Sequence, residues 1–191
     1  MLSAHIQELR TRRDRTVDQN MVTALTAEIS DNEAFQNQLT RTVLHLPSLA
    51  FNDRLMIHGS HRSLELVTFG GGHTDSDAFM LIPDEEIVFM GDLVTVRAHP
   101  AIMSGDVDEW IRILDRVQTL DIKTVVPGHG CVGTMNDVLA TKQYLSDLLN
   151  TDAWMSASKN IRPPPPYADW MMPYVFEWNV NSVRKWREKS V

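Results

Sequence analysis

The order of apolar and polar positions divides the 191-residue chain into three stretches with different periodicities. Residues 1–46 contain no glycine and no proline and are rich in Gln, Glu, Arg, Ala and Leu, which predicts helix. Met21, Leu25 and Ile29 recur every four residues, so they should share one helix face. Because most other positions in this stretch are polar, we expect an exposed helical arm or lid.

The middle stretch, residues 50–92, changes to the period of β structure. Residues 63–69 alternate polar and apolar side chains, as a half-buried strand does. Two short apolar runs follow, over residues 78–82 and 87–90, and the PDEE sequence between them predicts a turn. We therefore expect a β-hairpin with one buried face, separated from the first strand by a run of three glycines.

The C-terminal stretch, residues 105–191, alternates helical and strand patterns. Candidate N-cap residues precede two apolar stripes at helical spacing, and a run of four prolines cannot lie inside a helix. The patterns predict a helix capped by Asp106 or Asp108, a strand over 124–126 that stops at Pro127, a helix capped by Thr134, a polyproline connection over 163–166 and a closing helix over 179–188.

Composition adds limits to this picture. The apolar fraction of 43% is enough for a core, and no repeat or flexible linker is evident, so we expect one α/β domain of the α+β type over residues 1–191. The net charge of −7 disfavours nucleic acid and anionic membrane surfaces as partners. The absence of a long apolar run and of an N-terminal apolar segment predicts a cytoplasmic protein.

Three side chains that can bind metal each follow a strand-like run. They are His73 after the glycine turn, Asp92 at the end of the hairpin and His129 after the third strand. Loops beyond strand ends are where α/β sheets place their sites, and imidazole and carboxylate groups suit zinc, iron or manganese. Because glycine stands beside each of the three, a metal and a substrate could approach the backbone closely.

Further polar residues stand near these three candidates. Asp75 and Asp77 share the loop of His73, where ordering the loop or supporting the histidine is a better interpretation than binding metal. His99 follows the GDLV sequence, and we place it either at the mouth of the site or in a plain loop.

The sequence GGGHTDSDAFMLIPDEEIVFMGDLV, followed by a helix and then TVVPGHG, resembles the metallo-β-lactamase superfamily, most closely the hydrolase branch that includes glyoxalase II-like enzymes. The resemblance is best over residues 54–150. It implies that His73 binds one metal ion, that Asp92 bridges two and that His129 binds the second. It also implies an αββα sandwich, here a partial one in which residues 47–150 form the C-terminal sheet with its helices. Residues 1–46 would be a helical arm and residues 151–191 a tail with a helix.

The family's HxHxDH motif has no counterpart in this chain. The seven histidines stand at positions 5, 45, 58, 61, 73, 99 and 129; no two are two residues apart, and none follows an aspartate. Four of the seven ligand contributions in the family are therefore absent, and each metal position keeps two protein ligands. We expect a truncated form of the fold with one apolar sheet face exposed, and hence a homo-oligomer or a partner that covers this face.

Two functions follow from the resemblance. The first is a metal-dependent hydrolase, with zinc (or iron or manganese) as one or two ions, in which a metal-bound hydroxide attacks a small-molecule ester, thioester, amide or lactone. The alternative is a catalytically incompetent remnant that acts as a folding or interaction module and binds no metal by itself.

Overall fold

The computed structural model of the chain describes residues 2–150 and 161–189. By internal packing the chain divides into two compact units, one ending at Ala50 and the other beginning at Phe51. The sequence predicts a single domain with a helical arm over residues 1–46, so the division lies close to the predicted end of that arm. None of the described helices is long and apolar enough to cross a membrane.

The first unit is a pair of helices, α1 (Leu2–Arg15) and α2 (Gln19–Leu39). The predicted helix is interrupted because the carboxylate of Asp18 accepts hydrogen bonds from the backbone N–H groups of Asn20 and Met21 and so caps α2. Helix also ends earlier than residue 46, at Leu39. The four side chains buried between the helices are Ile6, Leu9, Leu25 and Ile29.

The predicted helix face in this unit is partly correct. Leu25 and Ile29 are buried against α1, as their spacing of four residues requires. Met21, the third member of the predicted stripe, is 40% exposed. Its exposure follows from the helix start, because Met21 lies in the first turn of α2, next to the cap.

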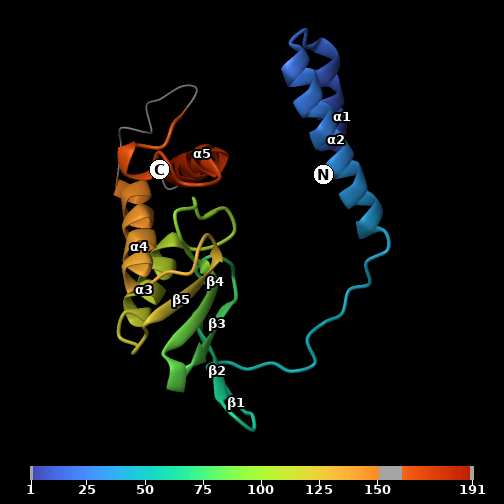
Figure 1. Cartoon of the computed structure of the whole chain (residues 1–191). Coiled ribbons are helices and arrows are strands. Elements are labelled where there is room, and N and C mark those ends of the chain that lie inside the picture. Colours follow the sequence, from blue (N-terminus) through green and yellow to red (C-terminus); the bar gives the residue numbers. More distant parts are fainter. Residues whose placement is uncertain (1, 151–160, 190–191) are drawn as a thin grey trace. The chain divides into compact units, whose positions relative to one another are not determined.

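The second unit is built on one five-stranded sheet (Figure 1). Neighbouring strands are antiparallel except for the last pair, which is parallel and is connected through a helix. The strands lie in chain order: β1 (Arg54–His58), β2 (Ser63–Gly70), β3 (Asp77–Ile82), β4 (Ile87–Thr95) and β5 (Thr124–His129). The predicted hairpin is the β3–β4 pair, which is connected through a 3-10 turn at Pro83–Glu85.

Helices α3 (Val107–Val117) and α4 (Met135–Asn150) cover one face of this sheet, and α5 (Pro173–Lys189) packs against α4 (Figure 1). Asp106 caps α3 by accepting a hydrogen bond from the N–H of Glu109. The main core forms between this face and the helices, and its fully buried members include Phe79, Val88, Val125, Trp110, Leu114, Leu145 and Phe176. The mixed α/β class expected from the sequence is therefore correct.

The opposite face of the sheet carries a continuous apolar row. The strand register places one residue from each strand side by side across all five strands. None of the five is buried, and Phe89 is 36% exposed. The helices of this unit lie on the other face, so its described elements leave the row uncovered. The row consists of Leu55, Leu66, Met80, Phe89 and Val126.

Three boundaries near the C-terminus differ from the prediction. Strand β5 continues through Pro127 to His129, because it lies at the edge of the sheet, where a residue without an N–H group is tolerated. The proline run does not remain extended, since Pro165–Tyr167 forms a 3-10 turn. Helix α5 begins at Pro173, before the predicted start at residue 179, and proline is favourable in a first helical turn.

Candidate metal centre

The three candidate ligands meet at one cavity of the second unit. His73 lies in the loop after β2, Asp92 near the end of β4, and His129 is the last residue of β5. All three line a cavity of about 80 Å³. The other residues that line it are Thr95, His99, Pro100, Ala101, Met172 and Val175. The sequence prediction that residues 73, 92 and 129 belong together therefore agrees with where the structure places them.

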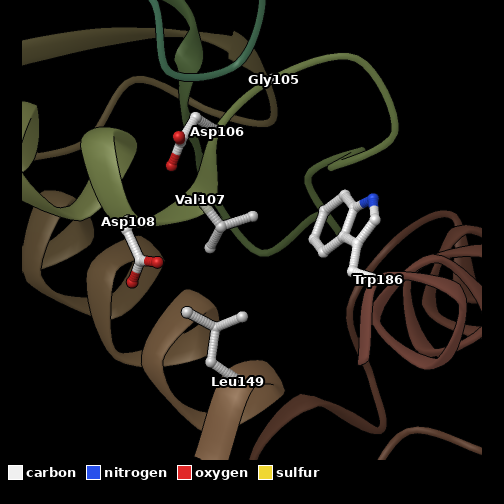
Figure 2. A pocket seen from close by; sticks show the side chains of 6 residues that line it. All are labelled: Gly105, Asp106, Val107, Asp108, Leu149 and Trp186. Atoms are coloured by element: carbon white, nitrogen blue, oxygen red, sulfur yellow. The ribbon is translucent and has the colours of Figure 1, made fainter. Parts of the chain in front are cut away.

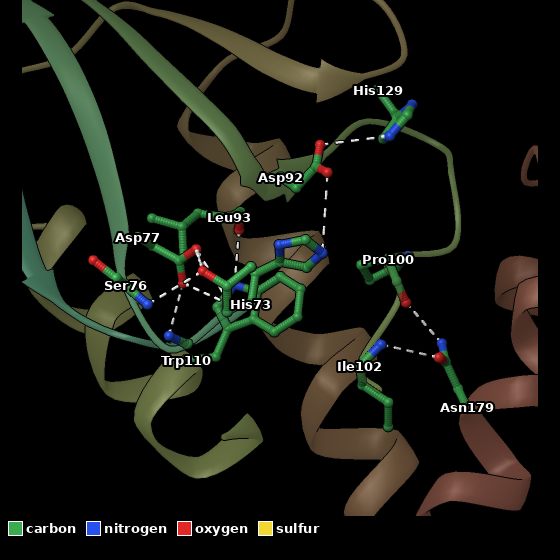
Figure 3. A network of polar contacts seen from close by, with 12 residues as sticks. His73, Ser76, Asp77, Asp92, Leu93, Pro100, Ile102, Trp110, His129 and Asn179 are labelled. Carbon is green, nitrogen blue, oxygen red and sulfur yellow. Dashed lines mark hydrogen bonds and ion pairs between the residues drawn. The ribbon is translucent and has the colours of Figure 1, made fainter. Parts of the chain in front are cut away.

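The carboxylate of Asp92 lies between the two imidazoles (Figure 3). Its Oδ1 is 3.5 Å from Nε2 of His129, and its Oδ2 is 4.0 Å from Nε2 of His73. Two ligand atoms on one tetrahedral zinc ion lie about 3.3 Å apart, because each bond is about 2.0 to 2.1 Å long. The donor types suit zinc on both sides of Asp92. The distance to His129 matches this spacing, whereas the distance to His73 is about 0.7 Å longer than a pair of ligands on one tetrahedral ion.

The number of donors falls short of a complete site. Within residues 2–150 and 161–189, no three His, Cys, Asp or Glu side chains are grouped so that they could hold one ion. A catalytic zinc site has three protein ligands and one open position. The described residues supply two donors to each position, so they fit part of a metal site and not a whole one.

Local backbone geometry keeps Asp92 in place. The parallel pairing of β4 with β5 brings Gly91 beside Pro127, and Gly91 adopts a φ of +52° that favours glycine. A Cβ atom on Gly128 would collide with Oδ1 of Asp92. It would also meet the backbone of Gly91 and Asp92 at 2.8 and 2.9 Å, so the close approach of the two strands requires glycine at this position. That the glycines leave room for a metal and a substrate stays a prediction.

Asp77 orders the loop that carries His73. Its carboxylate accepts hydrogen bonds from the N–H of Gly72 at 2.7 Å, from the N–H of Thr74 at 3.0 Å and from the hydroxyl of Thr74 at 2.7 Å (Figure 3). Asp75 is exposed, and its carboxylate accepts no hydrogen bond from any described residue. The two aspartates that the sequence treats alike thus have different positions, and Asp77 is the one that supports the loop.

Trp110 of α3 connects the loop of His73 with the strand that carries Asp92. Its Nε1–H donates to the carbonyl of Leu93, the residue after Asp92, at 2.9 Å. Its ring lies edge-on to the imidazole of His73, with centroids 5.3 Å apart (Figure 3). The sequence reveals Trp110 as part of an apolar helical stripe and gives no signal of this second contact.

His99 is buried in the wall of the same cavity and is 1% exposed. Burial lowers the pKa of its imidazole to about 4, against a smaller opposing effect of the Tyr167 backbone. Its Nδ1 lies 3.1 Å from the hydroxyl of Tyr144. The structure therefore places His99 inside the cavity wall, which is closer to the predicted site mouth than to a plain loop.

A second cavity, of about 260 Å³, lies at the N-terminus of α3 (Figure 2). Asp106, Asp108, Leu149 and Trp186 are among the residues that line it. Asp106 is already used as the helix cap, and the lining contains no histidine or cysteine. This cavity therefore lacks the combination of imidazole and carboxylate side chains that lines the cavity around Asp92.

Comparisons with known proteins agree with this geometry. The sequence profile of the metallo-beta-lactamase superfamily matches residues 11–129. The chain is 27% identical over 129 residues to metallo-beta-lactamase type 2 of Bacteroides fragilis, covering 62% of this chain and 52% of that protein. It is 34% identical over 64 residues to atrochrysone carboxyl ACP thioesterase of Aspergillus fumigatus, covering 34% and 20%.

A solved structure supports the fold. The metallo-beta-lactamase from Pontibacter korlensis superposes on the chain with a TM-score of 0.51 and 24% identity, covering 60% of this chain and 62% of that one. The chain spans about half the length of the Bacteroides relative. The shared fold is the two-layer α/β arrangement described above.

The hydrogen bonds of Asp77 predict that Asp77→Asn destabilises the His73 loop. An amide has one acceptor oxygen where the carboxylate has two, and hydrogen bonds to charged groups contribute about 1.5 to 3 kcal/mol each. We expect the free energy of unfolding, measured by urea denaturation, to fall by about 1 to 3 kcal/mol. The matched variant Asp75→Asn should change it by less than about 0.5 kcal/mol, as exposed substitutions usually do. Equal losses in both variants would contradict the assignment.

Burial of His99 predicts a pH dependence of stability. As the pH falls below 6.5, the unfolded chain binds a proton at this residue, whereas the folded chain does not until about pH 4. The unfolded state then binds more protons, so this residue's contribution to stability is present above pH 6.5 and is lost as the pH falls toward 4. Urea denaturation between pH 7.5 and 4.5 should show a shallower loss of stability for His99→Phe than for the unaltered chain. Parallel curves would show that His99 does not titrate in this way.

Proposed function

Because the chain belongs to the metallo-β-lactamase superfamily, we propose that the cluster around Asp92 is part of the metal centre of a metal-dependent hydrolase. The observation that carries the proposal is the position of one carboxylate between two imidazoles in a cavity. The proposed substrates are esters, thioesters, amides or lactones, which all react at an acyl carbon. The two curated relatives carry the names of a thioesterase and a β-lactamase, and this supports an acyl substrate.

The proposed roles of the three residues follow from their contacts. His73 and His129 would each hold one position, and Asp92 would contribute one oxygen to each. A zinc ion bound there would supply a Lewis acid and an activated water. Asp77 and Trp110 keep the His73 imidazole oriented, and the apolar side chains of Met172 and Val175 narrow the cavity. The missing third donor of each position would have to come from outside the described residues.

Zinc binding tests this proposal directly. We expect the purified chain to bind zinc weakly, because two donors hold an ion less firmly than three. Isothermal titration should show that Asp92→Ala weakens binding at least tenfold, since Asp92 contacts both imidazoles. His58→Ala, a change at an exposed histidine on β1, is the matched control and should leave the affinity unchanged.

The same samples should be assayed for turnover of p-nitrophenyl acetate with and without zinc. Zinc-dependent turnover that Asp92→Ala removes would support the hydrolase. A chain that binds no zinc, shows no turnover and keeps its melting temperature in the presence of a chelator would contradict it and favour the remnant.

A second candidate function, an interaction module, is favoured by the uncovered apolar row on the sheet. We propose that a second copy of the chain covers this face, so that two sheets pack against each other as in β-sandwiches. The row runs across all five strands and includes the exposed side chain of Phe89. An apolar surface of this extent is unfavourable in water unless something covers it.

Sedimentation velocity tests the pairing of two copies. The unaltered chain should show a dimer that dissociates on dilution, and Phe89→Asp should weaken it at least tenfold by placing a charge in the interface. Leu139→Asp changes a similarly exposed leucine on α4, which lies on the helical side of the sheet, and should have no effect. A monomer at all concentrations, or equal effects of both variants, would rule out this use of the row.

A further inference from the structure

His99 has a property that the proposed metal ligands lack, because it is a buried polar side chain in the wall of their cavity. Its imidazole packs among three aromatic rings, those of Tyr144, Trp170 and Phe176, with centroids 5.4 to 5.7 Å away. The ring is thereby held in one orientation. The nitrogen that carries the proton can donate a hydrogen bond to a ligand, and the other nitrogen can only accept one.

The hydrogen bonds around Tyr144 locate this proton. The amide of Asn179 is oriented by two backbone contacts, since its Oδ1 accepts from the N–H of Ile102 at 3.1 Å and its Nδ2 donates to the carbonyl of Pro100 at 2.7 Å (Figure 3). The same Nδ2 donates to the hydroxyl oxygen of Tyr144 at 3.0 Å. The one hydrogen of that hydroxyl is therefore directed to Nδ1 of His99, 3.1 Å away.

Because Nδ1 of His99 accepts, the proton of the neutral ring lies on Nε2. Burial raises the pKa of Tyr144, which keeps its hydroxyl protonated, and burial lowers the pKa of His99, which keeps the ring neutral at pH 7. Nε2 is buried and has no hydrogen-bond partner among the described residues. The Tyr167 carbonyl is near enough to raise the pKa of the ring, but it does not meet the geometry of a hydrogen bond with Nε2.

A buried donor without a partner is unfavourable, so such groups in folded proteins need an acceptor. The adjoining cavity of about 80 Å³ can hold about two water molecules or one small acyl group. Esters, thioesters, amides and lactones share the acyl oxygen, and their hydrolysis leaves a carboxylate. A fixed N–H donor in the wall of the cavity that Asp92 also lines would therefore serve any of these substrates, whatever the leaving group.

We propose that Nε2–H of His99 donates a hydrogen bond to the acyl oxygen of the ligand in this cavity and so positions that group in the cavity that Asp92 also lines. The identity of the ligand rests on the proposed hydrolase function, whereas the position of the proton does not. His99 acts here as a binding residue, held in its donor form by Tyr144 and Asn179.

The first test is the protonation state of His99 in the intact chain. Long-range nitrogen–proton correlation spectra of the ¹⁵N-labelled protein at pH 7 should show a neutral ring with the proton on Nε2. Tyr144→Phe removes the donor to Nδ1 and should shift the Nδ1 resonance most. A ring with its proton on Nδ1, or a doubly protonated ring, would overturn the proposal.

The second test is the binding of acetate, a product-like carboxylate, followed at the same resonances with and without zinc. We expect a saturable shift of His99 Nε2. The double variant His99→Phe/Tyr144→Phe keeps the aromatic packing and leaves no unpaired hydroxyl, and it should weaken acetate binding about tenfold or more. His99→Gln retains an amide donor and should lose less.

These outcomes separate the donor role from the hydrolase function. Acetate binding that depends on the His99 donor, in a chain without turnover, would support the donor role and count against the hydrolase. Acetate that binds equally well to the double variant, or leaves the Nε2 resonance unchanged while zinc still binds, would overturn the donor role alone. Unchanged melting temperatures confirm that each variant is folded.

Discussion

The site depends on Trp110, whose buried side chain connects the loop after β2 with strand β4. The indole donates to the carbonyl that follows Asp92 and packs against the imidazole of His73. The backbone of α3 at this tryptophan also lies so close to Gly72 that a Cβ there would meet it at 2.9 Å. The loop after β2 and the end of strand β4 are thus positioned by a residue that also fills the core, so the cavity wall and the core are held by the same side chain.

The third ligand is placed by a different constraint, the parallel pairing of β4 and β5. Parallel neighbours end at the same edge of a sheet, which brings His129 to Asp92 although 37 positions separate them in the sequence. Gly128 then has to lack a side chain because the backbone of β4 and the carboxylate of Asp92 both occupy that space. Two separate contacts therefore position Asp92: the hydrogen bond from Trp110 to the neighbouring Leu93 and the pairing of β4 with β5. Together they explain why its two oxygens face different imidazoles.

The sequence predicts this arrangement in part. The alternation of residues 63–69 and the two apolar runs of the hairpin identify three strands, and the glycine-flanked residues His73, Asp92 and His129 identify the cavity. Properties that depend on distant contacts are not visible in it. The spacing of Trp110 indicates a helix stripe, but its bond to Leu93 exists only after folding. His99 looks like a loop residue, because the aromatic rings that bury it come from positions 144, 170 and 176.

The exposure of the ligands bears on the choice between a metal centre and a folding remnant. The side chains of Asp92 and His129 are 40% and 50% exposed, and ion pairs at such positions contribute about 0 to 1 kcal/mol to stability. Packing therefore gives almost no reason to hold this carboxylate between two imidazoles. The glycine at position 128 does not add to this stability, because it is required by the close approach of the two strand backbones as well as by the carboxylate. A carboxylate that is held between two imidazoles and contributes this little to folding is better explained by a ligand that binds all three side chains, which favours the metal centre.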